Sequence, residues 1–548
     1  MTHVADGGGH TFTPANVIPS QRASANRSQA IELTTVQRPA SPSSTIGDNF
    51  GNGGLSTELE LDQALTPIES ATTVRDGASV RTLGRSVEAG LASEATLVNT
   101  SALPPVDTGF GAWSFLVAAF IVDAIVDGFP LSYGILLNAY LRDEHYRTQK
   151  FAMNLLPLIG TLSSGLNYCS SILIQPFISR YPQYRRLYLF SGVVISFVSL
   201  YAASYVTKLP HLLLLQGILF GFGSSLVTSA STAYIMSEWF VEKRELANMI
   251  VFSGPAAGGV VYPFIISALL RTRTVPETLR VLSFLIPGLC IPFLPFLKGR
   301  LPTARVVGPG ARGSSSRAWL KDRLFWVGLG ANTLQGLGHF VPVLWLPVFA
   351  MDLNLGACNA AVVLAVLSGA IFVGQTCMGV LSNHFDPWLL GLSNLFLTCI
   401  ATFVFWGVLS RTLVGLLVFS ATYGCVSGGW SSLWVGFLKS VAKDDHLLAG
   451  SLIRYMLFSR GIGQIASTQI AAALMSHSSN YVSQGNGIDT PSNSTSDGYD
   501  PMERVKLGFG VGDGRFQNVI VYAGSCFASA AVPVVIGWAL TKTWRRGN

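Results

Sequence analysis

Charge is what this sequence has least of. Lys, Arg, Asp and Glu make up 12% of the 548 residues, roughly half of the about 25% found in soluble globular proteins. So small a charged fraction argues against a nucleic-acid-binding protein and against most soluble enzymes. Hydrophobic residues make up 49% of the chain and the mean hydropathy is +0.45. We therefore expect an integral membrane protein whose main solvent is the lipid bilayer, with no nucleic acid as partner.

Paired cysteines are also missing. The seven cysteines stand singly in apolar stretches, without a CxxC spacing and without a histidine at ligand spacing. A disulfide scaffold is therefore excluded, and a single cysteine in such a stretch behaves as a small apolar residue. We expect no metal site and no cofactor.

The first part of the chain lacks both aromatic residues and long apolar runs. Residues 1–109 are rich in Ser and Thr and contain neither the basic segment nor the apolar segment of a cleavable signal peptide. Such a segment cannot bury enough apolar surface to offset the entropy lost on ordering. We predict a disordered tail that stays in the cytosol.

Long apolar stretches begin at Phe110. A membrane-spanning helix needs roughly 20 apolar residues, and twelve candidates are present. They begin near Phe110, Phe151, Leu187, His211, Arg244, Leu279, Leu324, Cys358, Trp388, Thr412, Ala449 and Phe516. The predicted fold class is an all-α membrane protein with twelve transmembrane helices in two six-helix halves.

The breaks between these stretches predict the domain organisation. A basic, Gly- and Ser-rich segment at 298–323 separates the sixth span from the seventh. We expect a first half at 110–297, a cytosolic linker at 298–323, a second half at 324–543 with an outer loop near 476–515, and a cytosolic C-terminus at 544–548.

Lys and Arg positions predict the orientation, because loops on the cytosolic side carry an excess of both. Three groups would lie on the side of the tail: Arg180 with Arg185 and Arg186, Lys243 with Arg244, and the linker. The charges at 271, 273 and 280 run against the rule. The outer loop contains a glycosylation sequon at Asn493. We expect a multi-pass glycoprotein of the plasma membrane, with an organelle membrane as the alternative.

Three charges remain inside the predicted spans. Asp123 and Asp127 lie on one face of the first span, one turn apart, and Arg460 lies near the middle of the eleventh. A carboxylate at the bilayer centre costs about 2.5–3.5 kcal/mol on insertion scales, so such groups are usually functional or paired. The two carboxylates repel each other, which favours a bound proton on one of them. Arg460 would either receive a substrate carboxylate or neutralise one of these aspartates.

Uncharged polar residues extend the predicted substrate or proton pathway. The seventh span carries Asn332, Gln335 and His339 along one face, which is typical of a helix that lines a water-filled cavity. His339 would either titrate there or remain a neutral, hydrogen-bonded histidine, which is the commoner case. Gln216 in the fourth span is a further candidate. In the tenth span, Trp430 and Trp434 would either stack on a planar substrate or fill space between helices.

Glycines concentrate at the start of the fifth span, in the run Gly254-Pro255-Ala256-Ala257-Gly258-Gly259. Proline removes a backbone donor and glycine allows close approach of helices. The run predicts a bendable, tightly packed helix, as alternating access requires.

The twelve spans with a basic central linker resemble the major facilitator superfamily. The run from Asp107 through Gly109 to Trp113 is similar to the opening motif of its monocarboxylate porter family. The run from Trp239 to Ala247, which includes Phe240, Lys243 and Arg244, is similar to that family's fifth-span motif. Residues 379–386 and 460–463 resemble fungal members.

The resemblance implies a secondary transporter, yet three of the family's charges are absent. The positions of its first-span Lys and eighth-span Asp and Arg align with Leu131, Ile371 and Gln375. The family's route for lactate and a proton is therefore missing, and any proton coupling would need other groups.

We expect a transporter of a small organic anion or related metabolite, with protons as a possible coupled ion, and not an enzyme. The Gly-Pro-x-x-Gly-Gly run also resembles the antiporter motif of drug-efflux proteins, so export of a secondary metabolite by proton antiport is the alternative. A nutrient sensor that does not transport is a second alternative.

Overall fold

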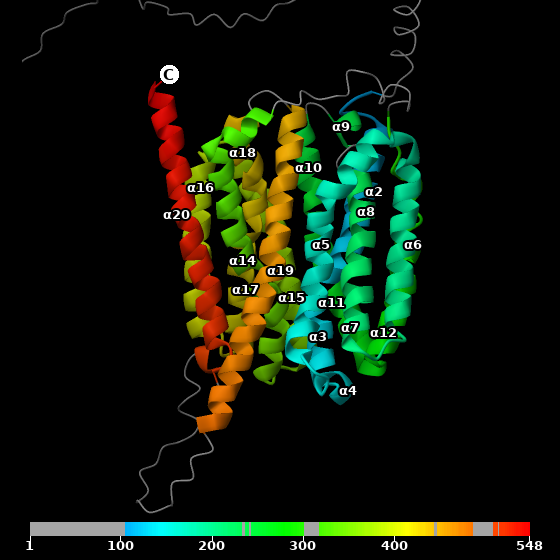
Figure 1. The fold of residues 1–548 in the computed structure, drawn as a ribbon, viewed down its shortest axis with the longest axis vertical. Coiled ribbons are helices and arrows are strands. Elements are labelled where there is room, and N and C mark those ends of the chain that lie inside the picture. Colours follow the sequence, from blue (N-terminus) through cyan, green and yellow to red (C-terminus); the bar gives the residue numbers. More distant parts are fainter. Residues whose placement is uncertain are drawn as a thin grey trace, which may run out of the picture. The chain divides into compact units, whose positions relative to one another are not determined.

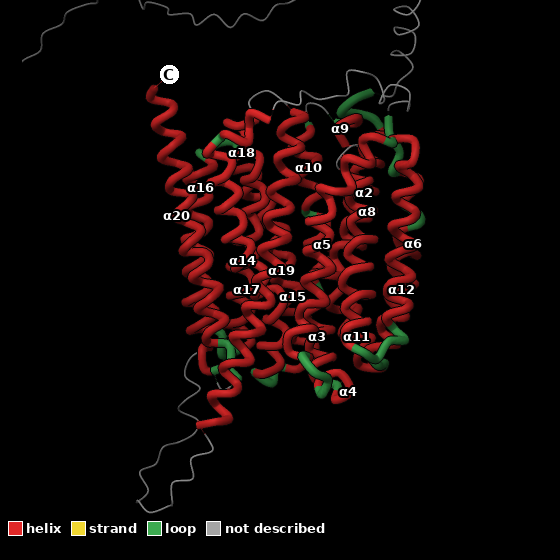
Figure 2. The backbone as a smooth tube through the Cα atoms, viewed as in Figure 1, coloured by secondary structure: helices red, strands yellow, loops and turns green. Residues whose placement is uncertain are grey.

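The computed structural model describes residues 105–232, 236–240, 243–300, 317–442, 446–485, 508–512 and 514–547. Every regular element in these ranges is helical (Figure 2). The predicted all-α membrane class is confirmed. The tail as far as residue 104, most of the linker and Asn493 lie outside the described residues.

The first half is built from six spans. Its helices are α2 (Phe110–Leu131), α3 (Tyr133–Arg142), α4 (Glu144–Arg147), α5 (Ala152–Arg180), α6 (Arg185–Ala203), α7 (Leu209–Leu212), η2 (Leu213–Leu219), α8 (Phe220–Thr232), α9 (Met236–Trp239), α10 (Arg244–Phe252), α11 (Gly254–Thr272) and α12 (Val275–Cys290). The first, fourth and fifth spans are each made of more than one helix.

The second half contains the other six spans. Its helices are η5 (Arg317–Lys321), α14 (Arg323–Asp352), α15 (Gly356–Leu381), α16 (Pro387–Ile400), η6 (Ala401–Leu409), α17 (Leu413–Gly428), η7 (Gly429–Leu433), α18 (Trp434–Ala442), α19 (His446–Gly485), η9 (Gly508–Gly510) and α20 (Gln517–Gly547). The spans begin within a few residues of the positions that the apolar pattern predicts.

Two of the twelve spans are less apolar than the rest. Ten helical stretches in the described ranges are long and apolar enough to cross a membrane. The remaining two are α5, with 29 residues, and α19, with 40. These two helices pack against each other, so each turns a polar and glycine-rich face to protein and not to lipid.

The helices run side by side between two ends (Figure 1). We call the end with α9, α10 and α18 the basic end, because Arg185, Lys243, Lys298 and Lys439 lie there on or beside the helix termini. The opposite end carries α3 and α4. The last turns of α20 also lie toward the basic end.

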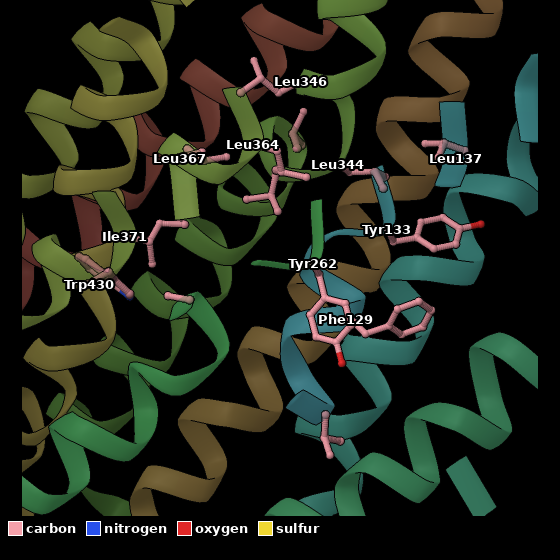
Figure 3. Close-up of a cluster of buried hydrophobic side chains, with 14 of the residues drawn as sticks. Phe129, Tyr133, Leu137, Tyr262, Leu344, Leu346, Leu364, Leu367, Ile371 and Trp430 are labelled. Carbon is pink, nitrogen blue, oxygen red and sulfur yellow. The ribbon is translucent and has the colours of Figure 1, made fainter. Parts of the chain in front are cut away.

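Buried apolar side chains join the two halves. Phe129 of α2 packs edge-on to Tyr262 of α11, with ring centroids 6.2 Å apart. Figure 3 shows this pair beside Leu344 of α14 and near Leu364 and other buried apolar side chains of α15. Side chains from both halves therefore form one shared apolar core.

Candidate functional site

A cavity of about 930 Å³ lies at the basic end. Its walls come from α10 of the first half and from α15, α18 and α19 of the second, together with the segment between α15 and α16. Trp388 and Trp434 contribute aromatic surface, and Gln375 contributes an amide. The cavity is large enough to hold a drug-sized molecule.

The two halves meet directly between the cavity and the opposite end. In α5 and α19, Gln464 donates a hydrogen bond to the Ser164 hydroxyl. One turn away, a Cβ on Gly461 would lie 2.7 Å from the Gly165 carbonyl oxygen, so the backbones touch. Further contacts between these helices involve Cys169 with Phe458 and Gln469 with Asn154. The structure is therefore closed at the α3–α4 end and open at the basic end.

Arg460 lies just beyond the inner wall of the cavity. Its side chain projects from α19 and the residue is only 6% exposed. The guanidinium carbon lies 5.7 Å from the centre of a Trp434 ring, which lines the cavity, and 5.2 Å from the Phe340 ring. Aromatic faces attract a cation, but they do not neutralise it.

Of the two alternatives for Arg460, the ion pair with Asp123 or Asp127 is not formed among the described residues. No carboxylate in the described ranges lies within 4.0 Å of the Arg460 nitrogens. Its hydrogen bond goes instead to the Gln335 amide oxygen, at 3.0 Å from Nη1. Aside from helix backbone, the contacts described for the positive charge of Arg460 are thus with the uncharged groups of Gln335, Phe340 and Trp434.

Gln335 and His339 lie on the face of α14 that Arg460 contacts. Each has a buried nitrogen, Nε2 of Gln335 and Nδ1 of His339, that makes no hydrogen bond to any described residue. The His339 ring is stacked on Tyr423 with centroids 6.2 Å apart. A buried polar nitrogen without a partner costs about 1–3 kcal/mol, so a ligand that bonded to these nitrogens would gain from it.

Asn332 and Trp430 connect neighbouring helices through hydrogen bonds. Both amide hydrogens of Asn332 are used, at 2.7 Å to the Met456 carbonyl oxygen and 2.7 Å to the Ser459 hydroxyl. Its amide oxygen accepts a bond from the Trp430 indole at 3.0 Å. This set of bonds ties α14, η7 and α19 together, so Asn332 and Trp430 position Arg460 and are not free to contact a substrate.

Asp127 belongs to a hydrogen-bonded chain across three helices of the first half. Nδ2 of Asn167 in α5 lies 2.8 and 2.9 Å from the two oxygens of the Asp127 carboxylate. The Asn167 amide oxygen accepts a bond from Thr228 of α8 at 3.0 Å. These hydrogen bonds hold the Asp127 carboxylate in a fixed orientation inside the first span.

Asp123 is more deeply buried, at 4% exposure. Asp123 lies at the contact of α2 with α11, where a Cβ added to Gly254 would be 3.2 Å from the Cβ of Asp123. Its carboxylate is also within electrostatic range of Cys290 and Tyr168. The two aspartates therefore have different surroundings, although both lie on α2.

Tyr168 of α5 lies within electrostatic range of Arg460, Asp127 and Asp123. The packing of α5 on α19 places its Cβ 3.1 Å from the position of a Cβ on Gly461. Sequence reasoning missed this residue, because a tyrosine in an apolar helix has no signal of its own without knowledge of its neighbours.

Gln216 belongs to a separate hydrogen bond. Its amide oxygen accepts from the Tyr140 hydroxyl at 3.0 Å, and Tyr140 packs edge-on against Tyr146 at 5.0 Å. This group joins η2 to α3 and α4. The described contacts of Gln216 do not include Arg460 or the aspartates.

The glycines of α11 allow close contact with both halves. A Cβ on Gly258 would lie 1.9 Å from the Ala124 carbonyl oxygen of α2, and one on Gly259 would lie 2.7 Å from the Ser368 hydroxyl of α15. Pro255 stands in the first turn of the helix. The predicted tight packing is present here, on the helix face next to Asp123.

The two motifs that begin near residues 107 and 239 meet at the basic end. The Asp107 amide donates to the Trp239 carbonyl oxygen, and its carboxylate accepts from the Lys243 amide, both at 3.0 Å. Trp113 packs edge-on against Phe240 at 6.1 Å. These contacts fix the start of α2 against α10.

Two further features complete this network. Gly109 adopts a φ of +89° that side chains other than glycine rarely take. A buried ion pair joins Arg185 to Glu238, the residue before Trp239, at 2.7 Å. Arg244 begins α10, and its side chain lies outside the described set.

Residues 109–468 match the Major Facilitator Superfamily. The chain belongs to this superfamily and is a membrane transporter. A search of solved structures finds the nucleoside transporter NupG, with a TM-score of 0.54, 11% identity, and coverage of 78% of this chain and 99% of that one. At that identity the likeness supports the fold alone.

Curated relatives are MFS transporters of fungi. The chain is 27% identical to the MFS-type transporter pynF of Aspergillus niger, over 70% of this chain and 87% of the relative. It is 24% identical to the aspyridones efflux protein apdF of Emericella nidulans, over 59% and 63% respectively. The riboflavin transporter MCH5 of Saccharomyces cerevisiae is also 24% identical, over 67% and 73%. The names of the last two relatives record different substrates, aspyridones and riboflavin.

Proposed function

We propose that this MFS transporter exports a small organic anion, a secondary metabolite, from the cytosol by alternating access of its two halves. The observation that carries the proposal is Arg460. A buried cation with no carboxylate partner among the described residues, one side chain away from a large cavity, is suited to receive an anion. Efflux is supported by relatives whose names record it.

Proton coupling is the second part of the proposal. Asp127 and Asp123 lie in the first half, Arg460 lies in the second, and Tyr168 is within electrostatic range of all three. Protonation of an aspartate would change the field at the anion site through this short path. Because protonation removes a negative charge near Arg460, a bound proton would strengthen anion binding, and release of the proton would weaken it.

The resemblance to monocarboxylate porters supports the same class of transport with a changed site. Leu131, Ile371 and Gln375 replace that family's charged residues, and Gln375 lines the cavity. We propose that Asp123, Asp127 and Arg460 take their place.

The location is proposed on the charge pattern. The halves at 110–297 and 324–543 would sit in the plasma membrane with the basic end in the cytosol. The outer loop would then carry a glycan at Asn493.

The test compares metabolites inside and outside cells with and without the protein. Deletion should retain a set of acidic metabolites in the cells, and the wild-type chain should release them. Arg460→Gln should fail to restore release. Arg454→Gln should restore it, because Arg454 lies about two turns nearer the basic end and its side chain donates to the Ser451 hydroxyl.

Three other outcomes would count against parts of this function. If deletion raises the metabolites outside the cells, the direction is import. If no metabolite shifts between the two compartments, transport itself is wrong. If removal of residues 1–100 abolishes a nutrient response while flux is absent throughout, the chain is a sensor.

A further inference from the structure

We propose that the substrate is a planar, aromatic organic anion of drug-like size, with its charged group on Arg460 and Gln335 and its rings against Trp434. This inference rests on the proposed function and adds the substrate class. It differs from the small aliphatic acids that the monocarboxylate resemblance implies.

The charged group is assigned to Arg460 and to the N–H groups of two residues that contact it, Gln335 and Trp434. Arg460 donates to the Gln335 amide oxygen at 3.0 Å, which turns the amide nitrogen of Gln335 away from the guanidinium. That nitrogen makes no hydrogen bond to a described residue, and Gln335 is only 1% exposed. The Trp434 indole nitrogen is likewise buried and has no partner in the described ranges. A neutral acceptor would leave the Arg460 charge uncompensated, whereas an anion satisfies all three donors.

The body of the ligand is defined by the aromatic surface at the same place. Trp434 lines the cavity with one part of its ring system and contacts the Arg460 guanidinium at 5.7 Å. Trp388 adds a second indole to the cavity wall. Flat ring systems stack on indoles with centroid separations of about 4.5–7 Å. A ligand whose charge lies on Arg460 therefore has its rings beside Trp434.

The volume of the cavity sets the size. At about 930 Å³ it lies near the upper end of the roughly 300–1,000 Å³ that hold drug-sized ligands. An acid of a few carbon atoms would leave most of this space to water and would not reach from Arg460 to the mouth.

The charges that line the cavity favour the same sign of ligand. Lys243 and Lys439 are among its lining residues, against one carboxylate, Asp386. The Asp386 carboxylate also accepts the Trp388 amide at the start of α16, at 3.0 Å. The net charge of the lining therefore attracts anions from the basic end.

The experiment measures binding to the purified full-length protein by quenching of tryptophan fluorescence and by calorimetry. The probes are naphthalene-2-carboxylate, its neutral carboxamide, decahydronaphthalene-2-carboxylate and lactate. The carboxamide lacks the charge. Decahydronaphthalene-2-carboxylate keeps the charge and nearly the same size but is not planar, and lactate lacks the ring system altogether. We expect naphthalene-2-carboxylate to bind at least about tenfold more tightly than each of the other three.

Two variants connect this preference to named residues. Arg460→Gln should weaken naphthalene-2-carboxylate by about tenfold or more and leave the carboxamide unchanged. Trp434→Leu should remove the preference for the planar acid over its saturated analogue, and Trp434→Phe should keep it. Arg454→Gln is the control for folding and purification. Size-exclusion profiles and melting temperatures would identify a variant that fails to fold, and Gln335→Leu would then replace it.

The results separate the two proposals. If all four probes bind equally or none binds, while cells still show export, the substrate class is wrong and the proposed function stands. If naphthalene-2-carboxylate binds as expected but no metabolite moves in cells, the site exists and transport is wrong. If Arg460→Gln leaves the affinity for the planar acid unchanged, the assignment of its charged group is overturned.

Discussion

At the scale of single residues, the two halves contribute opposite charges in different states of pairing. Asp127 accepts hydrogen bonds from Asn167, which in turn accepts from Thr228. Arg460 has a neutral hydrogen-bond partner and aromatic neighbours. The Asp127 carboxylate is thus hydrogen-bonded within the first half. Arg460 has no carboxylate partner among the described residues, which suits it to bind an anion from outside the protein.

Asp127→Asn should uncouple flux from the pH gradient. The amide imitates a protonated carboxyl group that cannot release its proton, and the charge-assisted bond to Asn167 is lost, which corresponds to about tenfold or more in rate or affinity. Flux driven by a pH gradient across proteoliposomes should fall by that amount, and its pH dependence should flatten. Exchange of substrate without a gradient should persist.

Glu144→Gln is the matched control for this variant. It removes a carboxylate that is exposed at the start of α4, outside the spans, and should leave the pH profile as it is. An unchanged pH profile in Asp127→Asn would assign Asp127 to a structural role. Asp123→Asn, measured in the same way, would show whether coupling belongs to Asp123.

At the scale of elements, glycine decides how closely the central helices approach. In α11, Gly254 and Gly258 pack on the backbone of α2 beside Asp123, and Gly259 packs on α15. In α5 and α19, Gly165 and Gly461 serve the contact between halves. Close backbone contact is how membrane helices gain packing energy without a hydrophobic driving force.

Gly258→Ala should lower the melting temperature and the flux together. The new Cβ would lie 1.9 Å from a backbone oxygen, so α11 has to move away from α2 at a cost of about 1–3 kcal/mol. Gly288→Ala in α12 is the control, because a Cβ there meets nothing within 4 Å. It should leave both properties unchanged. Equal melting temperatures for the two variants would contradict the packing seen at α2.

At the scale of the whole transporter, the cavity opens at the basic end, and the contact of α5 with α19 runs from the level of Arg460 toward the α3–α4 end. Alternating access requires α5 and α19 to separate at residues that now touch, such as Ser164 and Gln464. The halves would then close at the basic end, where the cavity is now lined by both of them.

A disulfide between these helices should therefore stop transport. The double variant Ser164→Cys with Gln464→Cys should form a cross-link under mild oxidation and lose most of its flux, since the opposite end cannot open. Reduction with dithiothreitol should restore flux, and each single variant should keep it after oxidation. Full flux in the verified cross-linked protein would mean that α5 and α19 do not separate there during transport.

The sequence by itself determined the fold class and the superfamily, because a span of apolar residues has only one low-energy form in lipid and the number of spans follows from counting. It also identified the three intramembrane charges, since each is costly at that depth. It left open whether Arg460 pairs with an aspartate or stays available to an anion, and it did not identify Tyr168 as a neighbour of these charges. Both depend on which helices are neighbours, and the period of a helix carries no such information.

Tertiary structure alone decided which polar residues are used up in packing and which remain available. Asn332 and Gln335 look alike along the seventh span, one turn apart. Every donor and acceptor of the Asn332 amide is satisfied by neighbouring helices, whereas Gln335 retains a buried N–H without a partner in the described ranges. The difference arises because hydrogen bonding depends on distances across helices, and these are set only when α14, α19 and η7 pack together.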